Sequence, residues 1–272
     1  MSRAPEDFRG LIIARYNYRE SDMLVKMLTD RFGKRMFLFR RARKPGFRMA
    51  AAILPFTVSD FVGTIASGSG LSYVNTVRGT VQFKQISSDL ELNAYTSYIL
   101  ALVDLAFDED QALPQWFAFT EQALKLIDSG TDPQIVTNIA EIQLLPSFGV
   151  GPNWRGCSVC GRSDLPLDFS DKYGGLLCSN HWELDPRRYH ASQRCVYYLR
   201  LFSQTDLLHL GKVAVREDTR RELRNVIDRI YDGLVGIQPK AKRFLDELNG
   251  AGSHIQALKP RRRDENHPDT SN

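Results

Sequence analysis

Three cysteines and one histidine are the residues of this chain best suited to hold a metal ion. Cys157 and Cys160 are separated by two residues, as are Cys178 and His181, and seventeen residues lie between the two pairs. A two-residue gap lets a tight turn aim both side chains of a pair at one ion, and Gly161 gives that turn the backbone freedom it needs. The spacing therefore predicts a tetrahedral Zn²⁺ site.

The region around these residues predicts a small zinc-ribbon-like insertion. LPLDFS and LLC indicate two short strands, and the YGG at residues 173–175 can form the turn that returns the second pair to the first. Four protein ligands leave no position for water, so we expect one structural ion per chain. His181 is the natural fourth ligand, and His190 and Cys195 are alternatives. Cys195 lies on an apolar helical stripe, where a buried cysteine is common.

The sequence shows no catalytic pattern beside this site. A zinc deaminase would need a His-x-Glu before Cys157, and a metalloprotease would need His-Glu-x-x-His; neither is present. A glycine-rich phosphate loop and a Gly-x-Ser-x-Gly nucleophile motif are also missing. A metal-dependent nuclease or hydrolase would need an open metal site. We therefore expect a protein that is not an enzyme.

A cationic segment near the N-terminus is the second group of candidate functional residues. Residues 34–48 contain no acidic residue and seven basic ones: Lys34, Arg35, Arg40, Arg41, Arg43, Lys44 and Arg48. Such a one-sided run repels itself without a polyanion, so we expect these side chains to bind nucleic-acid phosphates. Phe37 and Phe39 between them should fill a barrel core. Lys259 and the arginines at 261–263 form a weaker second patch.

Charge is distributed unevenly along the chain, although the net charge is only +4. Residues 1–48 hold thirteen basic residues against five acidic ones, whereas residues 85–147 hold one lysine against ten acidic residues. This asymmetry indicates a polyanion-binding module joined to a domain of another kind.

The elements that must position these residues fall into two groups. Five short segments rich in β-branched and aromatic residues predict a small β-barrel: FRGLIIARYNY, MLVKMLTD, KRMFLFRRARK, AAILPFTVSDFVGTIA and LSYVNTVRGTVQF. MLVKMLTD could equally be a helix, because the run is too short for periodicity to decide. After residue 83, helical patterns with capping Ser, Asp or Pro follow at 87–107, 113–130, 132–149, 191–209, 217–236 and 238–249.

These patterns predict a multi-domain α+β protein. We expect a barrel domain over residues 1–83 and a helical domain over 84–248, with the zinc-binding insertion at about 154–183. Residues 249–272 are polar and poorly patterned, which predicts a disordered tail. The chain has no run of eighteen apolar residues and no apolar N-terminal signal, and its four cysteines do not form a disulfide framework. A reducing cytoplasm is therefore the expected compartment.

Several motifs resemble the bacterial RecO family. The opening GLIIARYNYRESDMLVKMLTDRFGKRMFLFRRARKP contains a Glu-Ser-Asp turn, an apolar strand, a Phe-Gly-Lys turn and an Arg-x-Arg-Lys-Pro exit. CSVCG and YGGLLC resemble the zinc knot of that family, and QPKAKRFLDEL resembles its closing helix, so the likeness extends to about residue 248. The family usually has Cys where this chain has His181, an exchange that zinc accepts.

The resemblance implies an OB-fold over residues 1–83 that binds single- and double-stranded DNA. It also implies a recombination mediator of a RecFOR-type DNA repair pathway, which anneals strands and works with RecR. Such a protein helps RecA replace the single-strand-binding protein (SSB) and docks the acidic, apolar C-terminal tail of SSB, for which the basic helices of residues 183–248 should supply the cations. The residues alone leave two alternatives open: a protein-binding adaptor with an OB-like barrel and structural zinc, or a nucleic-acid-binding regulator.

Overall fold

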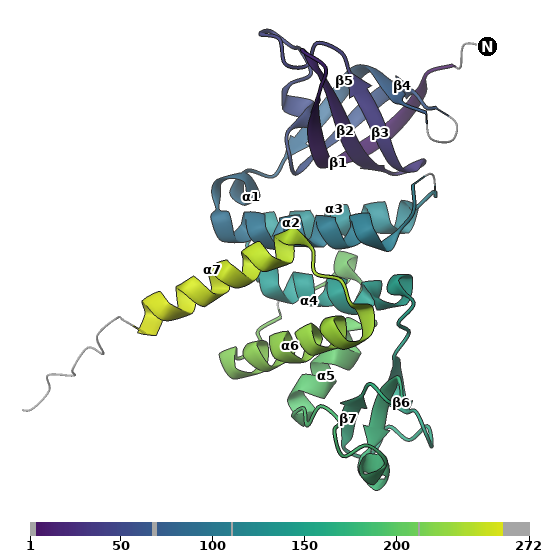
Figure 1. Ribbon diagram of the computed structural model, residues 1–272, viewed down its shortest axis with the longest axis vertical. Helices are drawn as coiled ribbons and strands as arrows, with labels where there is room; N and C mark the ends of the chain where they lie inside the picture. Colours follow the sequence, from purple (N-terminus) through teal and green to yellow (C-terminus); the bar gives the residue numbers. More distant parts are fainter. Residues whose placement is uncertain (1–3, 67–69, 110, 212, 258–272) are drawn as a thin grey trace, which may run out of the picture.

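A β-barrel, a group of helices and a small second sheet follow one another along the molecule (Figure 1). The structure is a computed structural model that describes residues 4–66, 70–109, 111–211 and 213–257. The change from strands to helices falls between residues 82 and 84. The barrel strands are β1 (Glu6–Tyr18), β2 (Asp22–Thr29), β3 (Gly33–Phe39), β4 (Thr57–Thr64) and β5 (Ser72–Gln82).

The barrel is closed, with the strand order β1-β2-β3-β5-β4. Every neighbouring pair is antiparallel except β3 and β5, which are parallel. The predicted barrel of five strands is confirmed, and the arrangement is OB-like. MLVKMLTD, which could have been a strand or a helix, forms β2.

The fourth strand begins later than the sequence predicted. Residues 51–53 form a short 3-10 turn, η1 (Ala51–Ile53), and β4 starts only at Thr57. Pro55 has no N–H to donate to a sheet. The Thr57 hydroxyl also donates to the carbonyl oxygens of Ala52 and Leu54, which stabilises the turn in place of an extended strand.

Aromatic side chains fill the barrel core. Phe37 and Phe39 are 0% and 1% exposed, as predicted for inward-facing positions of a strand. Phe8 of β1 stacks on Phe37 with ring centroids 5.1 Å apart, and Phe61 of β4 contacts both Phe8 and Phe39. The alternation therefore leaves the residues between them for the outer surface of the barrel.

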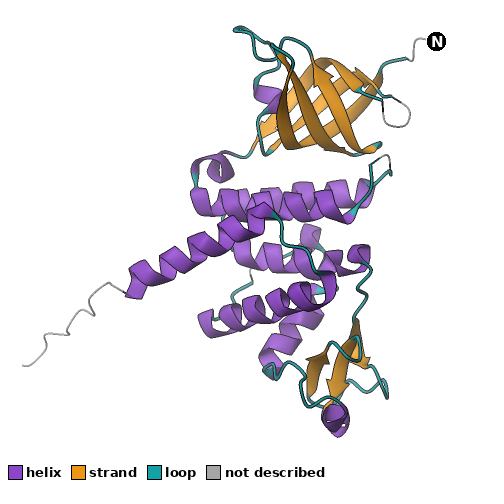
Figure 2. Ribbon diagram, viewed as in Figure 1, coloured by secondary structure: helices purple, strands orange, loops and turns teal. Residues whose placement is uncertain are grey.

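The helical domain lies between the barrel and the small sheet (Figure 2). Its α-helices are α1 (Lys84–Ser88), α2 (Leu90–Ala106), α3 (Pro114–Asp128), α4 (Pro133–Leu144), α5 (Gln193–Phe202), α6 (Glu217–Ile230) and α7 (Lys240–Ala257), with short turns η2 (Leu145–Phe148) and η4 (Leu207–His209). Asp89 and Asp132 cap α2 and α4 by accepting hydrogen bonds from backbone N–H groups of the first turn. Among the described residues, no helix is both long and apolar enough to cross a membrane.

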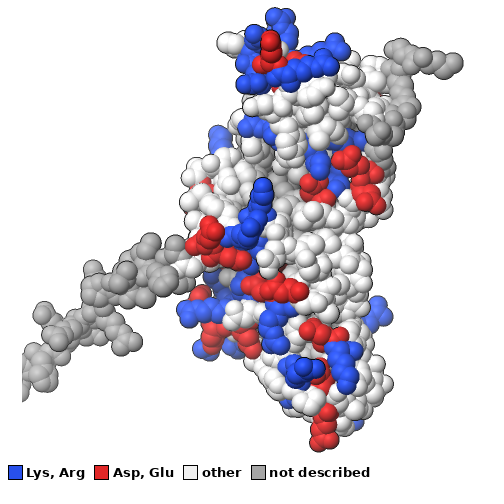
Figure 3. Space-filling model, viewed as in Figure 1, with Lys and Arg blue, Asp and Glu red and all other residues white. Residues whose placement is uncertain are grey.

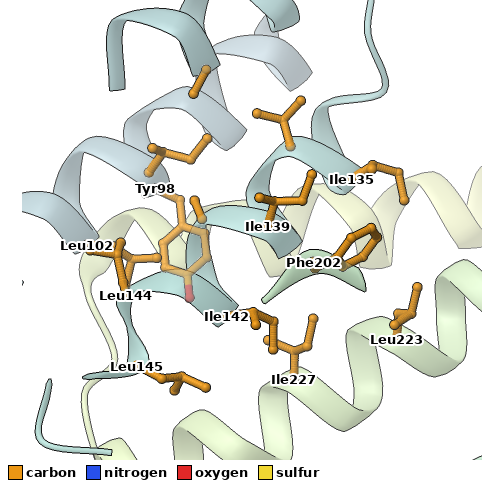
Figure 4. Packing of buried hydrophobic residues seen from close by; sticks show 14 of the residues in the cluster. Tyr98, Leu102, Ile135, Ile139, Ile142, Leu144, Leu145, Phe202, Leu223 and Ile227 are labelled. Carbon is orange, nitrogen blue, oxygen red and sulfur yellow. The ribbon is translucent and has the colours of Figure 1, made fainter. Parts of the chain in front are cut away.

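The core of this domain forms where α2, α4, α5 and α6 meet (Figure 4). Tyr98 of α2, Ile139 of α4, Phe202 of α5 and Ile227 of α6 are all less than 2% exposed. The Tyr98 hydroxyl donates to a carboxylate oxygen of Glu141 at 2.8 Å, so the one polar atom of this ring is satisfied within the core.

Three helices differ from the lengths that the sequence predicted. α5 ends at Phe202, and Asp206 then caps the separate turn η4 by accepting from the Leu208 N–H. α6 ends at Ile230 and continues as a π-helical turn, η5 (Tyr231–Val235). α7 continues to Ala257, so residues 250–257 are helical although the sequence predicted a disordered tail; glycine disfavours a helix by only about 1 kcal/mol per residue. Residues 258–272 lie outside the described residues.

Charged side chains join the barrel to the helices. The Arg9 guanidinium on β1 donates two hydrogen bonds, of 2.9 and 2.6 Å, to the buried carboxylate of Glu121 on α3. Asp104 on α2 accepts from two lysines of the barrel, Lys26 of β2 and Lys34 of β3. Leu11 and Leu28, which face outward from the barrel, belong to the same apolar cluster as the helices. The barrel is therefore held by both apolar and ionic contacts.

Candidate functional site

The four predicted metal ligands lie together on the small sheet. This sheet comprises β6 (Asn153–Cys157), β7 (Leu167–Ser170) and β8 (Gly175–Cys178) in the order β6-β8-β7. The β7–β8 hairpin matches the prediction, whereas β6, a five-residue strand without clear alternation, was not predicted. Cys157 ends β6, Cys178 ends β8, and His181 lies in the short turn η3 (Ser179–Leu184) that follows.

The four ligand atoms lie close enough together to share one tetrahedral zinc ion. All four ligand atoms lie within 4.8 Å of one another. The sulfur atoms of Cys160 and Cys178 are 3.7 Å apart, and His181 Nδ1 lies 3.5 Å from Cys157 Sγ and 3.2 Å from Cys178 Sγ. Bonds of about 2.3 Å to sulfur and about 2.0 Å to nitrogen place tetrahedral ligand atoms about 3.5–3.8 Å apart. The residues present therefore suit this ion.

The turn between the first two cysteines depends on glycine. Gly161 has φ +75°, and its N–H donates to the Cys157 carbonyl oxygen at 2.8 Å. Gly156 lies so close to Gly161 that a Cβ at Gly156 would be 2.5 Å from the Gly161 carbonyl oxygen. The sequence WRGCSVCG thus folds into the tight turn that points both thiols to one side.

Backbone N–H groups stabilise the thiolate form of Cys157. Burial opposes its ionisation, but hydrogen bonds from the backbone N–H groups of Cys178, Cys160 and Val159 lower the pKa to about 6. Burial and the two neighbouring thiols raise the pKa of Cys178. Zinc binds the thiolate, so these hydrogen bonds favour the form of Cys157 that would hold the ion.

The two alternative fourth ligands lie elsewhere. The Nε2 atom of His190 is 3.1 Å from the Pro186 carbonyl oxygen, and its backbone N–H donates to Asp168. Cys195 is buried on α5, and burial raises the pKa of its thiol. Within the described part of the chain, the structure groups His181 with the three cysteines. Such a site with four protein ligands could hold a structural ion but offers no open position for catalysis.

Five of the seven predicted nucleic-acid ligands are exposed on the loop after β3. We call this loop, residues 40–48, the basic loop; its exposed cations are Arg40, Arg41, Arg43, Lys44 and Arg48. Figure 3 shows Lys and Arg side chains gathered at the end of the barrel farthest from the helices, where β3 ends. A smaller acidic group lies among them, and blue and red side chains are mixed more evenly at the end of the molecule that carries the small sheet.

The basic loop is anchored mainly by its backbone, and the Arg43 guanidinium adds one bond, donating to the Glu20 carbonyl oxygen at 3.3 Å. The Arg43 N–H donates to the Ser21 carbonyl oxygen at 2.9 Å. The Arg41 N–H donates to an Asp22 carboxylate oxygen at 2.7 Å, with Arg41 at φ +56°. Both contacts join the loop to the β1–β2 turn, so they fix its path and leave the guanidinium groups at the surface.

The other two predicted cations lie on β3 and are not exposed as the loop cations are. Lys34 is only 3% exposed, and its ammonium donates to both the carbonyl oxygen and a carboxylate oxygen of Asp104. The Arg35 guanidinium donates to the carbonyl oxygens of Phe32 and Ala66. β3 begins at the helices and ends at the free end of the barrel, so one continuous run of cations spans two different surroundings. Lys34 joins two domains, and Arg35 holds neighbouring segments of the barrel.

One cation at the same end of the barrel was not predicted. Arg19 is exposed in the β1–β2 turn with φ +49°, and its guanidinium carbon lies 5.2 Å from the centre of the Tyr18 ring. The predicted basic segment was defined as a run without acidic residues. Arg19 lies outside that run, because the acidic residues Glu20 and Asp22 follow it. The signal that could have found it is the turn itself, since a β1–β2 turn in an OB-like barrel adjoins the binding face.

Comparisons with known families agree with the division of the chain. A family model described as "Recombination protein O N terminal" matches residues 1–83, and one described as "Recombination protein O C terminal" matches residues 87–243. The first therefore covers the barrel, and the second covers α2 to α6 together with the small sheet and ends at the start of α7.

Similar proteins are found along nearly the whole length of the chain. "DNA repair protein RecO" of Levilactobacillus brevis is 52% identical over 94% of this chain and 98% of that protein. The protein of the same name from Latilactobacillus sakei subsp. sakei is 53% identical over 93% of each. The one from Lactiplantibacillus plantarum is 48% identical over 95% of this chain and 99% of that protein.

Proposed function

Since this chain belongs to the RecO family of DNA repair proteins, we propose that it is a recombination mediator that binds DNA through the basic loop of its barrel. The observation that carries this proposal is the exposure of five cations on one loop whose backbone is held by the neighbouring turn. Contacts of this kind neutralise phosphates and carry no sequence information.

Phosphate contacts without sequence preference suit the annealing of complementary strands. Cations that bind one strand reduce its repulsion of a second strand and leave the base edges free to pair. The same contacts can compete with SSB for the strand, which would help RecA to replace it. The work is an exchange of partners and needs no bond chemistry, so we propose that the protein is not an enzyme.

Helix α7 offers a surface for an acidic, apolar peptide such as the SSB tail. Lys240, Arg243 and Phe244 occupy positions i, i+3 and i+4, which lie on one face of a helix. All three side chains are exposed, Phe244 by 41%. Two cations beside an apolar ring complement an acidic and apolar tail. We assign RecR to the helical domain only by the resemblance of the family.

The metal site acts in this proposal as a structural support. Cys157, Cys160, Cys178 and His181 would hold one Zn²⁺, which when bound would fix η3 against the ends of β6 and β8. Thiolate ligands need a reducing compartment, which agrees with a protein of the bacterial cytoplasm that joins the nucleoid when it binds DNA.

Salt dependence is the direct test of the proposed function. Labelled single-stranded DNA is titrated with the protein at several salt concentrations, first as free strand and then coated with SSB. Affinity should fall steeply as salt rises, because phosphate contacts release counterions. Affinity that stays constant with salt would contradict the proposal and favour a protein-binding adaptor.

A further inference from the structure

We propose that the outer face of the barrel beside the basic loop is a stacking surface for the unpaired bases of single-stranded DNA. This inference rests on the proposed DNA-binding function. The proposed surface would contact the bases, whereas the basic loop would contact the phosphates. Its aromatic side chains lie outside residues 34–48.

Strand register places four side chains in one row on this face. Tyr16 of β1 is paired with Leu24 of β2, Leu24 with Leu38 of β3, and Leu38 with Tyr73 of β5. Directly paired residues point to the same side of a sheet, and successive residues point to opposite sides. Because Phe37, next to Leu38, is buried in the barrel core, the row lies on the outside.

The two ends of this row are exposed aromatic rings. Tyr16 is 48% exposed and Tyr73 is 38% exposed, whereas Leu38 between them is 7% exposed. Neighbouring strands lie about 4.8 Å apart, so three strand spacings place the backbones of Tyr16 and Tyr73 about 14 Å apart along the sheet. The row is therefore an apolar strip with a ring at each end. Every base has a π-face that can stack on a tyrosine ring, whatever the sequence.

Cations border the strip on the side of the basic loop. The guanidinium carbon of Arg40 lies 5.5 Å from the centre of the Tyr73 ring. Arg19 lies over the ring of Tyr18, which is two residues beyond Tyr16 and so on the same face. A phosphate held by Arg40 would thus bring its own base to the neighbouring ring. This charge complementarity identifies the occupant as a nucleic acid.

The strip selects single strands over duplex. In a duplex each base is already stacked between its neighbours, so its π-face cannot reach a tyrosine ring, and the protein meets only the backbone and the base edges in the grooves. The cations of the basic loop can bind either form. The tyrosines should therefore add affinity for unpaired strands alone, and the side of an OB-like barrel formed by its second and third strands is a known place for such binding.

The test compares three probes of equal length: an oligo-dT strand, the same strand without bases, and a duplex. The protein with Tyr16→Ala and Tyr73→Ala together should bind oligo-dT about tenfold more weakly, with the other two probes bound as before within about twofold. Tyr16→Phe with Tyr73→Phe should bind oligo-dT as the unchanged protein does, because the ring is retained. Tyr197→Ala, which removes a ring that is 61% exposed on α5, is the matched control.

The unchanged protein provides a second measurement that does not depend on any variant folding. It should bind the strand without bases about tenfold more weakly than oligo-dT at the same salt concentration. Equal affinity for these two probes would overturn the inference, as would an alanine variant that is folded and binds oligo-dT normally. Failure of the unchanged protein to bind any probe in a salt-dependent way would instead overturn the proposed function.

Discussion

The basic loop and the group of metal ligands use their side chains in opposite ways. In the basic loop, two backbone N–H groups and one guanidinium bond from Arg43 hold the segment, and the charged side chains stay exposed. In the metal site the ligand atoms of the four side chains lie within 4.8 Å of one another. Side chains that hold one ion together are not available to bind a partner. We therefore propose that the most distinctive motif of the sequence supports the fold, and that DNA is bound by the cations that stay exposed on the basic loop.

The largest effect that would test this contrast is expected at the metal site. Cys178→Ser should reduce bound zinc from one ion per chain to none, as measured by elemental analysis. It should also lower the free energy of unfolding by several kcal/mol, because metal binding in such modules is coupled to folding. Cys195→Ser, at a buried cysteine outside the site, should lower stability and retain the zinc. Loss of DNA affinity in a fully folded Cys178→Ser protein would contradict the contrast.

The next largest effect concerns the basic loop. Changing Arg40, Arg41 and Arg43 to Ala should weaken single-stranded DNA binding about 100-fold at low salt and make the slope of log affinity against log salt shallower by about 2. The free energy of unfolding should change by less than about 0.5 kcal/mol, because these side chains are exposed.

A variant with the same loss of charge elsewhere is the control for this change. Arg194, Arg216 and Arg221 are exposed in the helical domain, and their replacement by Ala should leave DNA affinity within about threefold. Equal losses in the two triple variants would mean that net charge, and not the basic loop, determines binding.

A smaller effect separates two cations of the same run. Lys34→Met should lower the free energy of unfolding by about 2 kcal/mol, because it removes a buried partner of Asp104. DNA affinity per folded molecule should stay unchanged, as measured by titration at a temperature where the variant is folded. Arg40→Met should show the reverse, with normal stability and weaker DNA binding. If the Lys34→Met protein folded normally but lost DNA binding, Lys34 would have to be a DNA-binding residue.

The smallest effect is the response of the metal site to pH. Protons compete with zinc for the thiolates, so zinc affinity should fall as pH is lowered. The decline begins at high pH because the pKa of Cys178 is raised, and it becomes steeper below about pH 6, where Cys157 also takes up a proton. A zinc indicator in solutions from pH 8 to pH 5 measures the release. Zinc affinity that is constant over this range would contradict the assignment of thiolate ligands.

Local patterns were sufficient for the parts of the molecule that depend on neighbouring residues. The spacing of Cys157, Cys160, Cys178 and His181 predicted a group of ligands because each pair acts within one turn. The five strands and the inward direction of Phe37 likewise follow from alternation over a few residues. These features need no knowledge of how distant elements meet.

The sequence was insufficient where contacts between distant elements determine the position or burial of a side chain. The burial of Lys34 depends on Asp104, a residue seventy positions later on α2, so no local pattern distinguishes Lys34 from Arg40. The row from Tyr16 to Tyr73 depends in the same way on strand register across four strands. The helical pattern predicted an end at residue 249, because the residues that follow are polar and poorly patterned, whereas α7 continues to Ala257.

The ionic contacts beneath the barrel have a mechanical consequence. Arg9 with Glu121 and two lysines with Asp104 hold the lower ends of β1, β2 and β3 on α2 and α3. The basic loop is at the opposite ends of these strands, so the length of the barrel sets the distance between the basic loop and the helices. A strand bound at its tip would be carried at a set distance from the helices, and any protein held by those helices would meet the DNA at that spacing.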